Sequence, residues 1–258
     1  SVSGQPEKAI EWYEKGLEKF PNSGKLYLER GNIHLFNGEY GKALVYYELG
    51  IELDPEFSSN YYWATKIYCN SQEEVWGMIY GEIFMNLEKR NYKRIEEISE
   101  LLFKTYKSEI QFKNDTSISV SFCNNTLLDI ESINITDSNN LKLPFSMIYE
   151  QTLLLSLISV KNIDVSSLSQ VRSKFIDHYF NDNSDKSYPN ILFSFQKKLK
   201  DSGHFEAYNY WVMRKGDEES FYVWKSQNKE KWDAFVKWSK SNPFVIDYYK
   251  RFYRGQYK

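Results

Sequence analysis

The chain has 258 residues, with 12 Gly, 6 Pro and a formal net charge of −2. A chain of this length can bury a core without disulfides or metal, and its low glycine and proline content excludes a turn-rich barrel or sandwich. The 7 Trp, 21 Tyr and 17 Phe exclude a disordered chain, and the near-neutral charge excludes a global field for nucleic acid or an anionic membrane. The longest apolar stretch, 153–160, is far shorter than the ~20 residues of a membrane span.

The first hundred residues contain an internal repeat with a period of ~34 residues. Residues 4–21 align with residues 38–55, and the equivalent pairs are Ala9 with Ala43, Tyr13 with Tyr47, Gly16 with Gly50, and Pro21 with Pro55. Small residues recur where two helices approach closely, and proline recurs where a helix ends. Tyr27, Gly31 and His34 lie on the intervening helix. Over about residues 4–107 this pattern resembles the tetratricopeptide repeat family.

The repeat pattern continues in a weaker form after residue 57. The first helix of a third repeat is predicted from Tyr61, Ala64, Thr65 and Tyr68, with Thr65 in place of the family's glycine. Its second helix is predicted over 73–87, and an amphipathic helix follows over 91–106. The chain begins with the second helix of a repeat, so we expect the native protein to continue upstream, with a further repeat, a signal sequence or a lipid anchor.

The resemblance implies a binding groove, because the first helix of each tetratricopeptide repeat lines a concave surface that binds peptides or helices. The positions carried over to this chain are Lys25, Leu28, Glu29, Asn32, Leu35 and Phe36, then Ser59, Tyr62, Trp63, Lys66 and Asn70. The basic clamp that some relatives use for a terminal carboxylate is incomplete, which disfavours chaperone-tail binding. The aromatic members either anchor a partner or pack against neighbouring helices.

The segment 109–142 changes from a helical period to a period of two. Ile118, Val120 and Phe122 alternate with serines, which predicts an antiparallel hairpin or meander. Further short strands are predicted over 128–135. Sequons at Asn114, Asn124 and Asn134 are attributed to the local abundance of Asn, Ser and Thr rather than to glycosylation.

Helices return from residue 143 to the end of the chain. We expect one to begin at Pro144, one capped by Ser166 or Ser167 to run to about Phe180, and one with Pro189 in its first turn to end near Asp201. Three short aromatic-rich helices are predicted from 203, 217 and 228. The tail 248–258 interleaves basic and aromatic residues, which predicts a last amphipathic helix or, alternatively, a segment that binds single-stranded nucleic acid.

No catalytic or metal-binding motif is present in the sequence. His34, His178 and His204 have no partner at ligand spacing, and Cys69 and Cys123 lie too far apart for a redox or zinc motif. We expect His34 to serve in packing, His178 and His204 to have a structural or surface role, and both cysteines to be buried thiols. We therefore predict no enzyme activity, no cofactor and no metal.

These observations predict a mainly α protein in three parts: a tetratricopeptide array at 1–108, a β hairpin connector at 109–142 and an aromatic-rich helical domain at 143–258. The expected function is a non-catalytic protein-protein interaction module, or a subunit of a larger assembly, that binds a peptide or helix in the repeat groove. Residue usage and the fused architecture resemble tetratricopeptide proteins of bacterial envelopes, which favours the periplasm over the cytoplasm. The alternative is binding of a small molecule, glycan or single nucleic-acid strand by the aromatic-rich half.

Overall fold

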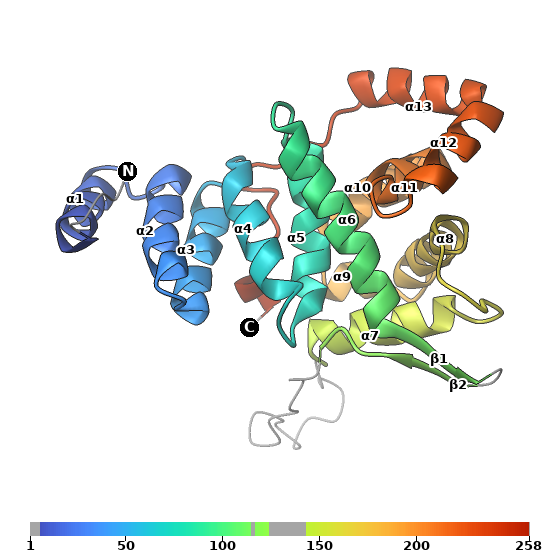
Figure 1. Cartoon of the computed structure of the whole chain (residues 1–258), viewed down its shortest axis with the longest axis horizontal. Helices are drawn as coiled ribbons and strands as arrows, with labels where there is room; N and C mark the ends of the chain where they lie inside the picture. The colour runs from blue at the N-terminus through green and yellow to red at the C-terminus, as the bar shows by residue number, and fades with distance from the viewer. Residues whose placement is uncertain (1–5, 115–116, 124–142, 258) are drawn as a thin grey trace.

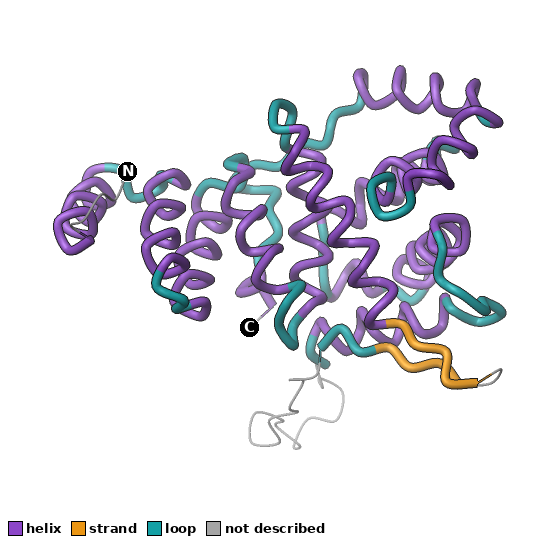
Figure 2. The backbone as a smooth tube through the Cα atoms, in the orientation of Figure 1, coloured by secondary structure: helices purple, strands orange, loops and turns teal. Residues whose placement is uncertain are grey.

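The computed structural model describes residues 6–114, 117–123 and 143–257. Within these ranges the chain forms thirteen α-helices, one two-stranded antiparallel hairpin and a short 3-10 turn near the C-terminus (Figures 1 and 2). The mainly α fold predicted from the sequence is therefore confirmed. In the described part of the chain, no helix combines the length and apolar character needed to cross a bilayer.

The N-terminal half is a row of antiparallel helices that lie side by side (Figure 1). They are α1 (Pro6–Lys19), α2 (Gly24–Phe36), α3 (Tyr40–Leu53), α4 (Ser58–Tyr68), α5 (Glu74–Leu87) and α6 (Tyr92–Glu109). The closest pairs are α2 with α3 and α4 with α5, as expected for two-helix repeats. Helices α1 and α3 end two residues before Pro21 and Pro55, where the repeat alignment predicted that each helix stops.

Small residues set the spacing between these helices. Ala43 is fully buried. A Cβ atom at Gly31 would lie 2.3 Å from the Tyr47 ring, and one at Gly50 would lie 2.2 Å from the Asn60 amide. A larger side chain at Ala43, Gly31 or Gly50 would force the helices apart, which is the steric role that the repeat alignment predicted. Ala9, the counterpart of Ala43 in α1, is only half-buried.

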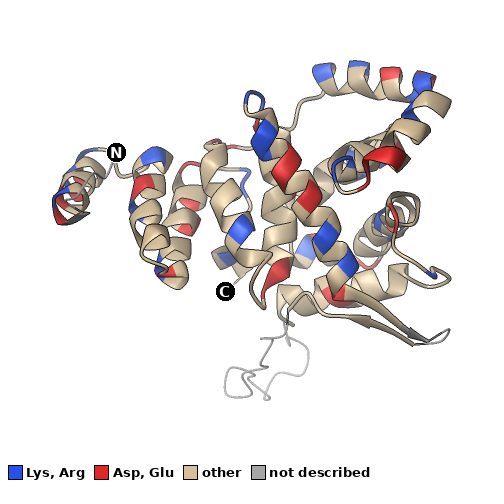
Figure 3. Cartoon of the chain, in the orientation of Figure 1, with Lys and Arg blue, Asp and Glu red and all other residues tan. Residues whose placement is uncertain are grey.

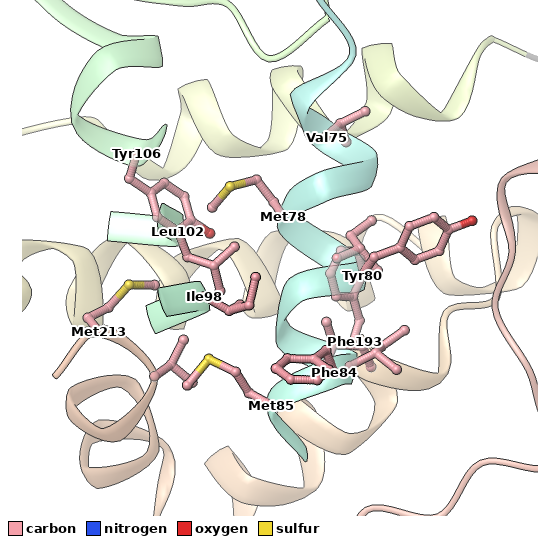
Figure 4. Close-up of a cluster of buried hydrophobic side chains, with 14 of the residues drawn as sticks. Val75, Met78, Tyr80, Phe84, Met85, Ile98, Leu102, Tyr106, Phe193 and Met213 are labelled. Carbon is pink, nitrogen blue, oxygen red and sulfur yellow. The ribbon is translucent and has the colours of Figure 1, made fainter. Parts of the chain in front are cut away.

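Helix α5 lies at the centre of the molecule, and its residues 74–85 are all buried. The repeat helices α4 and α6 cover part of its surface, and helices of the C-terminal half cover the rest. Figure 4 shows Met78, Phe84 and Met85 of α5 among side chains from both halves, including Leu102 and Met213. The buried hydrophobic residues therefore form one cluster, and the predicted three-part division of the chain stays a prediction.

The predicted hairpin is present as β1 (Ile110–Asn114) and β2 (Ser117–Val120). Ile110 pairs with Val120, and the register shifts between Phe112 and Asn114. Phe122 is fully buried after the hairpin and contacts the rings of Tyr106 and Tyr149 edge-on. The further strands expected over 128–135, and the sequons at 124 and 134, lie outside the described residues.

The C-terminal half is built from seven helices in the described residues. They are α7 (Phe145–Ser156), α8 (Val165–Asn181), α9 (Ser184–Ser187), α10 (Ile191–Asp201), α11 (Phe205–Met213), α12 (Glu218–Gln227) and α13 (Lys229–Ser241). Two predicted starts need correction. Asp164, rather than Ser166 or Ser167, is the N-cap of α8, since its carboxylate accepts from the Ser167 backbone in a capping box. Asn190 caps α10, so Pro189 precedes this helix.

The C-terminal tail does not form the predicted amphipathic helix. Only Arg254–Tyr257 are helical, as a 3-10 turn. The tail crosses back to the repeats, where Phe252 is fully buried and contacts the rings of Trp76, Tyr80 and Phe145. The tail rings dock into separate sites on distant helices, and an extended backbone reaches these sites where a helix would not.

Candidate peptide-binding surface

The candidate surface consists of the outward side chains of α2, α4 and α6, which we call the A-helix surface. Helices α2 and α4 were predicted as first helices of repeats, α6 is the amphipathic helix that follows the third predicted repeat, and α4 packs against both α2 and α6. The three helices therefore present neighbouring faces. The residues predicted for the groove lie on α2 and α4 or one turn beyond α4.

On α2 the predicted residues range from half-buried to fully exposed. Lys25 is exposed, and Phe36 at the helix end has 92% of its surface exposed. Asn32 accepts a hydrogen bond of 3.0 Å from the hydroxyl of Tyr47, which ties it to α3. The remaining members are half-buried: Leu28, Glu29 and Leu35. Phe36 is consequently the most accessible ring of this helix.

On α4 the Tyr62 ring is enclosed by helix α6. Only 4% of Tyr62 is exposed, the Arg94 guanidinium lies 4.5 Å from its ring centroid, and its hydroxyl donates to the Glu97 carboxylate. Burial, reinforced by Glu97, raises the pKa of Tyr62, so the hydroxyl remains a proton donor. Tyr62 thus contributes to packing between α4 and α6.

Trp63 is the accessible aromatic residue of α4. It is half-buried and meets Tyr62 edge-on with a centroid distance of 5.1 Å. The Lys66 ammonium lies 5.3 Å from the centroids of both rings and 3.9 Å from Glu97. Asn70 is exposed beyond the helix end and donates to the Lys66 carbonyl. Cation–π contacts of this kind hold a ring in a defined orientation at a surface.

Two residues of this surface were missed in the sequence, Arg94 and Glu97 of α6. Arg94 covers Tyr62 and also donates to the hydroxyl of Ser59 at 3.2 Å. Their three-residue spacing on the polar face of an amphipathic helix is the signal that could have indicated them. Along this helix in Figure 3, a basic group is followed by an acidic group and then by further basic residues, so the A-helix surface carries mixed charge beside Trp63.

The C-terminal half contains a separate aromatic cleft of ≈ 310 Å³. It lies between the end of α5, helices α10, α11 and α13, and residues 242–244 after α13. Six of the fourteen residues that line it are aromatic: Phe195, Tyr208, Trp211, Trp232, Phe235 and Phe244. Its volume falls at the lower end of the range found for small-molecule sites.

His34, His204 and Cys69 pack against neighbouring residues of the protein. His34 contacts Glu39 at 2.7 Å and stacks on Tyr46. His204 packs against Trp238, and burial lowers its pKa. Burial raises the pKa of the Cys69 thiol to about 12. Among the residues that the structure describes, no three His, Cys, Asp or Glu side chains are grouped to hold a metal ion.

Antiparallel helix pairs with small residues at their crossings define a helical-repeat protein. Residues 24–57, which comprise α2, α3 and the turns that follow them, match the model of the tetratricopeptide repeat. No other family is matched, so no catalytic family is found. No curated protein and no solved structure matches the chain. The chain thus contains a tetratricopeptide repeat, a unit that generally mediates protein-protein interactions.

Proposed function

We propose that this protein is a non-catalytic interaction module that binds a segment of a partner protein on the A-helix surface. The observation that carries the proposal is the pair of accessible rings, Phe36 and Trp63, on first helices of the repeats. Large aromatic side chains supply much of the binding energy at protein interfaces. An exposed Phe and a half-exposed Trp on such helices are therefore suited to anchor apolar side chains of the partner.

The charged residues of the A-helix surface make the proposed binding selective. The basic residues named on it are Lys25, Lys66 and Arg94, and the acidic ones are Glu29 and Glu97. Mixed charge around an apolar anchor favours a partner segment with complementary charges and disfavours uniformly charged partners such as nucleic acid. We therefore expect an amphipathic peptide or helix rather than a free terminal carboxylate.

The proposal extends to membership of a larger assembly, and a bacterial envelope assembly is the preferred setting. It rests on the resemblance in residue usage to tetratricopeptide proteins of bacterial envelopes. Both the partner assembly and its compartment are part of this proposal.

The test begins with affinity capture of partners from the native host, using the full chain and a Phe36→Ala, Trp63→Ala double variant. A partner of the A-helix surface is enriched by the full chain and lost by the double variant. Affinity for that partner should fall about 30-fold for the double variant, the loss typical of an interface hot spot. Trp12→Ala is the matched control, because Trp12 is 72% exposed and lies on α1, outside this surface. Equal binding by the double variant would refute the proposal.

A second candidate function is supported by the aromatic cleft of the C-terminal half. The alternative function predicted from the sequence is a binding site for a small molecule, a glycan or a single nucleic-acid strand in this region, between residues 211 and 238. The cleft has the size and the aromatic wall of a small-ligand site. Ligand binding there requires none of the residues of the A-helix surface.

A further inference from the structure

We infer, on the basis of the second candidate function, that the aromatic cleft binds an alkylammonium group, the chemistry of an aliphatic amine or a lysine side chain. Two independent observations carry this assignment. The first is the continuity of the aromatic wall, and the second is the hydrogen-bonding character of the polar groups at its rim.

The wall is a connected series of rings. Phe244 contacts Phe195, Phe195 contacts Tyr208, and Tyr208 contacts both Trp211 and Phe235, with centroid distances between 5.3 and 6.3 Å. Trp232 extends the series through Phe235 at 5.7 Å. Aromatic rings that line one cavity can attract a cation to their faces, and their apolar surfaces equally accept an alkyl chain.

At the rim, both amide protons of Asn86, one of the two amide protons of Asn242 and the hydroxyl proton of Ser239 are donated within the protein. Asn86 donates to the Glu82 carbonyl and the Tyr208 hydroxyl, both at 2.7 Å. Asn242 donates to the Trp238 carbonyl at 3.1 Å, and Ser239 donates to the Val236 carbonyl at 3.0 Å. No donor from the described residues reaches the Oδ1 atoms of Asn86 or Asn242. The rim thus offers these oxygen atoms as acceptors to a ligand that brings N–H groups.

One acidic and one basic residue lie at the rim, Glu88 and Lys89, so their charges cancel. The Glu88 carboxylate accepts hydrogen bonds from the Ser58 hydroxyl and from the backbone of residues 89–91. Burial of Glu88 would raise its pKa, but hydrogen bonds from the Arg90 and Asn91 backbone outweigh it and lower the pKa, which keeps the carboxylate ionised. Two cations already lie against wall rings from positions outside the cleft. They are Lys225, 4.9 Å from the Trp232 centroid, and Arg214, 5.5 Å from the Trp211 centroid.

The experiment is a calorimetric titration of the full chain at pH 7 with hexylammonium, 1-hexanol and Nα-acetyl-lysine methylamide. An alkylammonium is fully charged at this pH. We expect hexylammonium to bind at least about fivefold more tightly than 1-hexanol, the factor expected from a cation–π contribution. A tighter fit of acetyl-lysine methylamide points to a lysine side chain of a partner, and a tighter fit of hexylammonium points to a free amine.

Variants at Asn242 provide a test in opposite directions. Asn242→Asp should strengthen hexylammonium binding and Asn242→Leu should weaken it, each by about fivefold. Trp232→Leu should weaken it similarly, whereas Trp12→Leu on the distant α1 should leave it unchanged. Circular dichroism and thermal melts confirm that each variant is folded.

Two results would overturn the inference and are distinguishable. Equal affinity for hexylammonium and 1-hexanol, with no effect of Asn242→Asp, would refute the ligand class and leave the cleft as a binding site. An absence of binding by every probe would refute the cleft function itself. Neither result bears on the A-helix surface, whose test uses different residues.

Discussion

The buried guanidinium of Arg172 donates two hydrogen bonds, of 2.6 and 2.5 Å, to the carboxylate of Glu82, which lies 90 positions earlier in the chain. Gln196 donates a third hydrogen bond to the same carboxylate at 2.5 Å. Glu82 belongs to α5 of the repeats, whereas Arg172 and Gln196 belong to α8 and α10. The two halves of the protein are thus joined through one fully paired buried acid.

Removal of one member of this pair should strongly destabilise the protein. Arg172→Met leaves the Glu82 carboxylate buried without its counter-charge, which typically costs about 3–5 kcal/mol. Chemical denaturation followed by circular dichroism measures the loss. Glu82→Gln combined with Arg172→Met keeps an acceptor for Gln196 and removes both charges, so it should recover most of the stability. A double variant as unstable as Arg172→Met would contradict this account.

The close helix crossing at Ala43 should not tolerate a larger side chain. Ala43 is fully buried in α3, so Ala43→Leu should overpack the crossing and cost about 1–3 kcal/mol. Gly41→Ala in the same helix is the control, because a Cβ there meets no atom within 4 Å. The control should be neutral or slightly stabilising, and an unchanged melting temperature for Ala43→Leu would count against the repeat packing.

Tyr62 and Phe36 should respond differently to truncation, although both were predicted for the groove. Tyr62 is 4% exposed and Phe36 is 92% exposed. Tyr62→Ala should therefore cost about 3–5 kcal/mol of stability, and Phe36→Ala should stay within about 0.5 kcal/mol of the native protein. Urea denaturation of both variants checks this. Similar stabilities for the two would show that the Tyr62 ring is not enclosed by α6.

Glu74 should make the stability depend on pH between about 4.3 and 7. Burial, together with the neighbouring Glu109, Glu150 and Glu73, raises the pKa of Glu74 to about 7, while the ordinary glutamate pKa is about 4.3. The folded state then binds the proton more tightly than the unfolded state, so the stabilisation present at low pH is lost as pH rises through 7.

Denaturation midpoints across this pH range test the effect. Glu74→Gln should reduce the pH dependence and be more stable than the native chain at pH 8. Glu96→Gln, at an exposed position of α6, should retain the native profile. The prediction fails when the Glu74→Gln profile coincides with the native one.

The C-terminal tail should contribute substantially to stability through Phe252. This ring is fully buried, so Phe252→Ala should cost about 3–5 kcal/mol. Tyr249 lies in the same tail with 92% exposure, and Tyr249→Ala should be neutral. Thermal melts of both variants decide the matter, since equal melting temperatures would mean that the tail does not dock as described.

The features that could be predicted from sequence are those set by neighbours along the chain. Small residues and prolines at a 34-residue spacing predicted the helix pairs, because the contacts within each pair are local and the steric demand at each crossing is specific. The aromatic spacings after Gly203, Asp217 and Asn228 likewise predicted α11, α12 and α13. The accessible rings Phe36 and Trp63 were predicted through their equivalence to known repeat positions.

The features that could not be predicted depend on residues distant in sequence. Tyr62 of α4 is enclosed because Arg94 and Glu97 of the later helix α6 pack over it. The local sequence of α4 does not indicate which of its sides α6 covers. The tail 248–258 has helical spacing of its charges and rings, yet the burial of Phe252 among helices of both halves selects an extended path.

The sequence by itself determined the helical-repeat class, the helix pairs and the positions of the small residues, because these follow from short-range periodicity and close packing within a repeat. Only the tertiary structure decided that both halves share one core around α5, that Glu82 is paired with Arg172, and that six aromatic residues surround a single cleft. The physical reason is that burial and pairing of these groups arise from contacts between helices roughly a hundred residues apart, and their free energy depends on the assembled surfaces rather than on any local segment.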